Sequence, residues 1–365
     1  MKKSIVALLL TGILALAGCS TLLERDYLLL QPYQPISSST PISTSLRAEN
    51  YHDVVDAVRL LVAQGAEQGV ISLYNYSSPQ DVEDAITRAC LEVVQNDPLG
   101  AYAVDYIKHD HSLIVSYYEV SLTIVYRRTA EQVSSITSVT GTGALQQELK
   151  RTLSSFSPET TLRISHFTED ETYIRSLVED VYYNSPSTAF GLPEVSLAIY
   201  PNTGLQRIVE LNLTYSEAPE ILQLRSQELQ EYAAGLAAPS LAYENLFEIL
   251  LTGFVPSDTG FHKTAYDALV SQTSDSEGLA LACKLLCDQA GHPCIVVRGT
   301  LNGAPHFWNL IGDTTSGYRH VDLYTGTATW YDEDMSSTGY AWDTEQYPAA
   351  PSPADPPVES PAEEN

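Results

Sequence analysis

The sequence predicts an α+β protein in which two tandem small α/β units precede a C-terminal unit of helices followed by antiparallel strands. Three observations lead to this fold class. The order helix, strand, helix, strand, strand occurs twice between residues 49 and 238, and residues 241–334 place helical patterns before alternating strand patterns. Hydrophobic residues make up 44% of the chain and charged residues 18%, a balance typical of a globular protein with a real core.

The N-terminus has the organisation of an export signal. Met1-Lys2-Lys3 is basic, residues 4–18 are apolar and uncharged, and the stretch ends in Leu16-Ala17-Gly18-Cys19. This arrangement resembles the bacterial lipoprotein signal, which implies removal of residues 1–18 and attachment of lipid, palmitate included, to Cys19. The apolar run is shorter than the ~20 residues that span a bilayer. We therefore expect a lipid anchor that holds the protein on the extracytoplasmic face of a bacterial cell membrane.

The next segments follow in chain order. Residues 19–48 contain the lipidated Cys19 and a Ser/Thr/Pro-rich stretch typical of a tether. Landmarks such as Pro98 and Pro186 recur at a spacing of about 90 residues, longer than a solenoid repeat, so we expect two tandem units, at 49–143 and 144–238. A third domain follows at 239–348. The Pro/Glu-rich tail at 349–365 has the composition of a disordered segment.

Within the C-terminal domain the clearest element is a helix over residues 276–290. Asp275-Ser276 stands at its N-cap position, Glu277 lies in the first turn, and Gly291 and Pro293 are stop signals. The strands after this helix carry His306 and Asp322, which lie equally far from position 314 in the intervening turn. In an antiparallel pair folded at that turn the two side chains would lie opposite each other, or nearly so, on one face.

Ser276, His306 and Asp322 have the residue types of a nucleophile, a general base and an orienting acid. Two structural interpretations stay open beside the catalytic one. Ser276 can be a helix N-cap, and the His–Asp pair can be a cross-strand contact without a catalytic role. On the same strands His320 is expected to lie across from Trp308 as a cleft-wall residue.

A family resemblance strengthens the catalytic interpretation. The segment from TAYDALVSQTSDSEGLALACKLLCDQAGHPCIVVRGTLNGAPHFWNLI through YRHVDLY to YDEDMSSTGYAWDTEQYP resembles the transglutaminase-like domain of bacterial surface proteins, with its papain-type core. The resemblance covers residues 241–348 and implies a helix packed on an antiparallel sheet. The matching positions are Glu277-Gly278, Ala280, Gly291, Cys294, Gly299, His306, Trp308-Asn309 and Val321-Asp322. It implies a triad of Ser276, His306 and Asp322, with Glu277, Gly278, Trp308 and Asn309 lining the cleft.

The main departure from the family pattern is at the nucleophile. The family carries Cys directly before Glu-Gly, where this chain has Ser276. A thiol with a pKa near ~8.5 is readily deprotonated at a helix N-terminus, whereas a serine hydroxyl needs a base that removes its proton during attack. Phe307 also replaces a small residue beside the histidine, and Leu323-Tyr324 replaces Thr-Trp. A retained His and Asp without the thiol indicate a pseudoenzyme.

Several classes of partner are disfavoured. The net charge of −27 would repel nucleic acid, so none is expected as a partner. No metal or cofactor is expected either, because His109 and His111 have no third ligand at a recognisable spacing. The cysteines after Cys19 suit small buried hydrophobes, with a disulfide between Cys287 and Cys294 as the alternative.

Three functions remain from the sequence. The first is a non-catalytic surface lipoprotein whose degenerate transglutaminase-like domain binds a cell-wall peptide, a glycan or a surface protein. The second is a serine-nucleophile hydrolase, peptidase or acyltransferase that uses Ser276, His306 and Asp322. The third is a structural or assembly lipoprotein that acts through its tandem N-terminal units.

Overall fold

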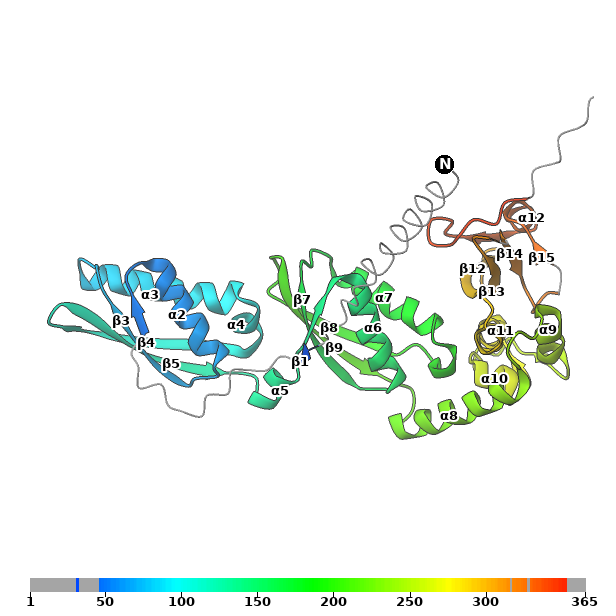
Figure 1. Ribbon diagram of the computed structural model, residues 1–365, viewed down its shortest axis with the longest axis horizontal. Coiled ribbons are helices and arrows are strands. Elements are labelled where there is room, and N and C mark those ends of the chain that lie inside the picture. Colours follow the sequence, from blue (N-terminus) through cyan, green and yellow to red (C-terminus); the bar gives the residue numbers. More distant parts are fainter. Residues whose placement is uncertain (1–30, 33–45, 316, 327–328, 353–365) are drawn as a thin grey trace, which may run out of the picture. The chain divides into compact units, whose positions relative to one another are not determined.

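The computed structural model describes residues 31–32, 46–315, 317–326 and 329–352 (Figure 1). The predicted signal segment, Cys19 and residues 353–365 of the predicted tail lie outside the described residues. The fold is a mixed α+β arrangement of helices and largely antiparallel sheets. The chain forms two compact units, one of residues 1–145, 161–167 and 200–208 and one of residues 146–160, 168–199 and 209–365. None of the helices described is both long and apolar enough for a membrane crossing.

The first sheet has the strand order β2-β3-β5-β4. Its strands are β2 (Leu46–Ala48), β3 (Gln68–Leu73), β4 (Val104–Ile114) and β5 (Tyr117–Tyr126). Three helices share a buried core with this sheet, namely α2 (Tyr51–Ala63), α3 (Pro79–Asn96) and α4 (Pro98–Ala103). Two strands lie inside the segment predicted as a tether, so parts of that segment belong to sheets. They are β2, which pairs with β3, and β1 (Gln31–Pro32), which pairs with β6 (Thr137–Thr140) of the next sheet.

The second sheet has the strand order β1-β6-β7-β9-β8. Its strands after β1 are β6 (Thr137–Thr140), β7 (Glu159–Ser165), β8 (Glu194–Tyr200) and β9 (Gln206–Thr214). The helices of this stretch are α5 (Ala130–Ser134), which comes before β6, then α6 (Gly141–Ser154), α7 (Glu171–Tyr183) and the short η1 (Pro186–Thr188). The order helix, strand, helix, strand, strand recurs, and β6 runs parallel to β7 as β2 does to β3. The division into domains at residues 143 and 238 stays a prediction.

The C-terminal part of the chain begins with helices and ends in a five-stranded sheet of order β15-β14-β13-β12-β16. The helices are α8 (Pro219–Leu236), α9 (Tyr243–Leu251), α10 (Ala265–Leu269), α11 (Ser276–Ala290) and α12 (Asp332–Ser337). The strands are β12 (Cys294–Leu301), β13 (Ala304–Asp313), β14 (Gly317–Val321), β15 (Thr329–Trp330) and β16 (Tyr340–Trp342), and β10 (Val255–Pro256) pairs in parallel with β11 (Thr273–Ser274).

Helix α11 is the centre of the C-terminal core, and its predicted bounds of 276 and 290 are confirmed. Nearly every residue of the helix is buried, in one cluster with residues of α8, α9, α10 and one face of the sheet. The opposite face of the sheet buries a second, smaller group that includes Trp308, Leu310, Met335 and Ala350. The sheet thus lies between two apolar layers, and Ala350 shows that the start of the predicted tail packs against it.

Candidate functional site

Strands β13 and β14 bring His306 and Asp322 together. Leu310 pairs with His320, so Asp322 falls opposite Trp308 rather than His306. The pair is therefore offset by two residues from a directly opposite one, in agreement with the expectation that His306 and Asp322 lie opposite each other or nearly so. Because side chains alternate along a strand, the two residues still share a face and meet on the diagonal. His306 Nε2 lies 2.7 Å from Asp322 Oδ2.

Four donors hold the Asp322 carboxylate. Besides His306, Oδ2 accepts hydrogen bonds from Tyr340 Oη at 2.7 Å and Thr325 Oγ1 at 2.9 Å, and Oδ1 accepts one from the Tyr324 backbone N–H at 2.9 Å. Burial raises the pKa of Asp322, but the hydrogen bonds from His306, Tyr340 and Thr325 outweigh it and hold the pKa below its ordinary value. Asp322 is therefore a fixed, ionised group.

The His306 imidazole is enclosed by aromatic rings. It stacks on Trp308 at 6.3 Å between centroids and meets Tyr324 and Tyr340 edge-on, each at 5.9 Å. A carboxylate can only accept, so Nε2 carries the proton that bonds Asp322, and in the neutral ring Nδ1 is left as an acceptor. Nδ1 has no hydrogen-bond partner among the described residues. His306 is only 7% exposed, so the group that would act as general base is largely covered.

Ser276 lies at the tip of α11, where its hydroxyl bonds a neighbouring strand. Oγ accepts a hydrogen bond from the Phe307 backbone N–H at 3.2 Å. The interpretation of Ser276 as the N-cap is wrong, because Asp275 has that position and accepts hydrogen bonds from two backbone N–H groups of the first turn. In the described part of the chain, Ser276 and His306 are not hydrogen-bonded to each other. The structure therefore joins His306 and Asp322 by a hydrogen bond, whereas the Ser276 hydroxyl bonds the backbone of Phe307, the residue that follows His306 on β13.

Glu277 and Gly278, predicted to line the cleft, are both buried at this helix tip. Glu277 Oε1 accepts a hydrogen bond from Tyr183 Oη at 2.9 Å, and Lys263 Nζ lies 3.8 Å from Oε2. Burial raises the pKa of Glu277 in spite of both partners. At Gly278 a Cβ atom would lie 2.7 Å from the Thr264 carbonyl oxygen, so the glycine lets the helix tip approach that loop. Both residues therefore belong to the buried packing of the helix tip.

Trp308 and Asn309, the other predicted cleft-lining residues, are each 1% exposed. Asn309 Nδ2 donates to the Ala280 carbonyl at 2.9 Å and so ties β13 to α11. Trp308 Nε1 donates to His320 Nδ1 at 2.9 Å, and His320 Nε2 lies 2.8 Å from Asp332 Oδ1. His320 is wholly buried, which lowers its pKa and favours the neutral ring. It is therefore a core histidine, and the prediction of a cleft-wall residue is wrong.

The remaining candidates have no part in this site. Cys287 and Cys294 are free thiols, so the alternative of a disulfide between them is not realised in the structure, and both are buried as expected of small hydrophobes. His109 and His111 lie on β4, where their Nδ1 atoms are 3.7 Å and 3.4 Å from Glu83 Oε2.

Four tyrosine and threonine residues of the site were missed by the sequence analysis. These are Tyr183, Tyr324, Thr325 and Tyr340, which bond Glu277 or Asp322. Tyr340 and Tyr324 had a signal, because they belong to the matched stretches YAWD and YRHVDLY. The others follow from tertiary packing, since Tyr183 comes from α7, far from α11 in the chain.

The chain matches no protein-family model and no curated protein. Among the solved structures to which it is similar is a TGase (12% identity, TM-score 0.24, 45% of this chain and 50% of that one). Two others are a candidate cysteine protease from Cytophaga hutchinsonii (14% identity, TM-score 0.22, 41% of this chain and 70% of that one) and a candidate protease from Parabacteroides distasonis (11% identity, TM-score 0.21, 72% of this chain and 43% of that one). The chain thus spans half the length of the TGase chain.

Proposed function

We propose that this chain is a bacterial surface lipoprotein, anchored through Cys19, whose degenerate transglutaminase-like domain binds a peptide, glycan or protein partner without catalysis. One observation carries the proposal. Ser276 stands at the nucleophile position, and its hydroxyl bonds the Phe307 backbone N–H instead of the His306 imidazole. A serine nucleophile needs a base within about 3 Å to take its proton as it attacks.

The retained His306–Asp322 pair has a structural role under this proposal. The buried 2.7 Å bond between them, together with the partly buried bonds from Tyr340 and Thr325, joins β13, β16 and the segment after β14 into one network. The His306–Asp322 bond at its centre is costly to break, because a lost partner leaves a buried polar group without a hydrogen bond. Such a network would persist after catalysis was lost.

A surface beside the remnant site offers a place for a partner. Val255 is 60% exposed and Phe261 is 86% exposed, on the segment between α9 and α10. The same segment contains Asp258, which accepts a hydrogen bond from the Tyr324 hydroxyl, and Tyr324 meets the His306 ring edge-on. Exposed apolar side chains next to a former catalytic pair suit a binding role. The ligand class stays among peptide, glycan and protein.

A serine hydrolase or acyltransferase is the second candidate. It is favoured by the 2.7 Å bond from His306 to Asp322 and by the free Nδ1 acceptor of His306. The Ser276 side chain would have to turn toward that nitrogen for the triad to form. This candidate requires the bond from the Phe307 N–H to break during the reaction.

Fluorophosphonate labelling separates the two candidates. We expect no labelling of the purified chain, and we expect Ser276→Cys to react with iodoacetamide at a lower pH than Ser271→Cys. The exposed Ser271 position is the matched control, because its thiol would keep an ordinary pKa of ~8.5. Labelling of the wild type that disappears in both Ser276→Ala and His306→Ala would overturn the non-catalytic proposal.

Binding is tested separately on peptide and glycan arrays. A ligand of this surface should lose at least tenfold in affinity in Phe261→Ala and keep its affinity in Ser276→Ala. A ligand that binds both variants equally well would show that the surface near Phe261 is not the binding site.

A further inference from the structure

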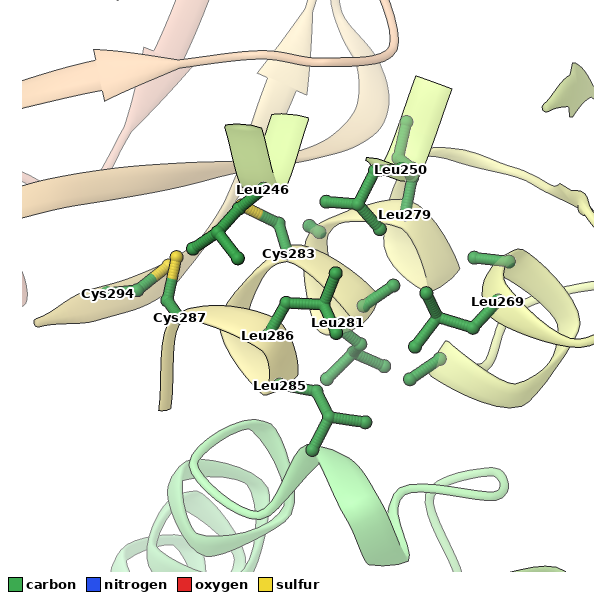
Figure 2. Close-up of a cluster of buried hydrophobic side chains, with 14 of the residues drawn as sticks. Leu246, Leu250, Leu269, Leu279, Leu281, Cys283, Leu285, Leu286, Cys287 and Cys294 are labelled. Carbon is green, nitrogen blue, oxygen red and sulfur yellow. The ribbon is translucent and has the colours of Figure 1, made fainter. Parts of the chain in front are cut away.

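Three thiols converge in the core of the C-terminal part of the chain. Cys283 and Cys287 lie on α11, and Cys294 is the first residue of β12. All three are free and buried, and their sulfur atoms lie within 4.8 Å of one another. Figure 2 shows them together at one side of the leucine cluster that fills this core. The site of His306 and Asp322 makes no use of them.

Local geometry explains how the sulfur atoms of these three free cysteines come close together. Cys283 and Cys287 are four residues apart, so they share a face of α11. Gly291, with φ of 79°, ends the helix in the left-handed conformation, and the His292 N–H returns to the Cys287 carbonyl at 2.8 Å. The chain then reverses, and Cys294 comes back beside the last turns of the helix. The three cysteines of the spacing C-x3-C-x6-C are therefore neighbours in space only in the folded chain.

We propose that Cys283, Cys287 and Cys294 form a binding site for one Cu(I) ion. A metal about 2.3 Å from each sulfur of a three-coordinate site holds the sulfurs about 4 Å apart, so the thiols need only a small inward shift from their present separation. Soft thiolate ligands select Cu(I), whereas structural Zn²⁺ takes four ligands. Among the described residues this cluster offers three sulfurs and no fourth carboxylate, imidazole or thiol.

The surroundings of the sulfurs suit bound thiolates. Asn309 Nδ2 donates to Cys294 Sγ at 3.4 Å, which stabilises negative charge on that sulfur. Lys284 Nζ lies 3.1 Å from the Cys294 carbonyl oxygen and is itself mostly buried. Binding would convert Cu⁺ and three thiols into one tris-thiolate complex and three protons released to solvent, with no electron transferred. The amide donor and the ammonium group both offset the charge of that complex.

Copper titration of the purified full-length chain tests the site. Every protein carries Cys19→Ser, is reduced and is kept anaerobic, and Cu(I) is supplied in competition with bicinchoninate. We expect one Cu(I) per chain, and at least tenfold weaker binding in each of Cys283→Ala, Cys287→Ala and Cys294→Ala. Cys90→Ala is the matched control, because Cys90 is also buried and free but lies outside the cluster; it should bind as the parent does.

X-ray absorption of the copper-loaded parent protein keeps the proposal testable if a cysteine variant does not fold. Three sulfur neighbours per copper and no nitrogen or oxygen neighbour is the expected result. Equal binding by Cys287→Ala and Cys90→Ala, a copper with nitrogen or oxygen ligands, or a disulfide among these three cysteines in freshly isolated protein would each overturn it. None of these outcomes bears on catalysis at Ser276, so the two proposals fail independently.

Discussion

Removal of the Asp322 carboxylate should destabilise the C-terminal part of the chain strongly. Asp322 is 2% exposed and accepts hydrogen bonds from His306, Tyr340, Thr325 and the Tyr324 backbone N–H. In Asp322→Ala all four donors lose their acceptor. Thr325 is exposed and can turn to water, but the His306 side chain is 9% exposed and has no such freedom.

The magnitude follows from this count of donors. Breaking a buried pair by removing one partner costs about 3–5 kcal/mol, and we expect Asp322→Ala to lie in that range. In Asp322→Asn one side-chain atom can still accept from the Tyr324 N–H, but His306 then faces either an amide N–H donor or an uncharged amide oxygen in place of the carboxylate. We therefore expect a smaller loss for Asp322→Asn, of about 1–3 kcal/mol.

Urea unfolding followed by tryptophan fluorescence measures both values. All three tryptophans of the chain, Trp308, Trp330 and Trp342, belong to the C-terminal sheet, so their signal reports this region. Asp343→Ala is the matched control, because Asp343 is exposed and accepts only a local hydrogen bond from the Glu345 N–H. It should change the free energy of unfolding by less than about 0.5 kcal/mol.

A loss below about 1 kcal/mol in Asp322→Ala would refute the reasoning, since it would mean that the four donors find other partners at no cost. An equal loss in Asp322→Ala and in the control would also refute it. The ranking matters as well, because Asp322→Asn should lie between the wild type and Asp322→Ala.

Three further predictions concern the same region. Hydrogen bonds hold the pKa of Asp322 below its ordinary value, so the stability that its carboxylate contributes is complete above the unfolded pKa of ~3.9 and is lost as pH falls through the folded pKa. The urea midpoints of wild type and Asp322→Asn, measured from pH 6 downward, should therefore converge. A constant gap between the two midpoints would contradict this. Ser276→Ala leaves the Phe307 N–H without its acceptor and should lower the free energy of unfolding by about 1 kcal/mol, whereas an unchanged urea midpoint would show that the bond is dispensable. At Gly299 a Cβ atom would lie 2.4 Å from the Ala341 carbonyl oxygen, so Gly299→Ala should cost about 1–3 kcal/mol and lower the melting temperature seen by calorimetry; a melting temperature equal to that of the wild type would disprove the close approach.

Helix α11 shows how far local signals reach. Its bounds were predicted from Asp275 and Gly291, because an N-cap side chain and a left-handed glycine act on backbone groups within one turn. The role of Ser276 was not predictable in the same way. Its partner is the backbone of Phe307, and that contact depends on how the helix packs against β13.

The sequence by itself determined the mixed α+β class, the helix of residues 276–290 and the placement of His306 and Asp322 on one face of a hairpin. Capping, turn residues and side-chain alternation all act over a few residues, and therefore leave a trace in the order of amino acids. The tertiary structure decided the rest: the two-residue offset of the His–Asp register, the hydrogen bond of Tyr340 to Asp322 and the convergence of the three thiols. Each of these depends on how separate elements pack together, because packing brings residues into contact irrespective of their distance along the chain.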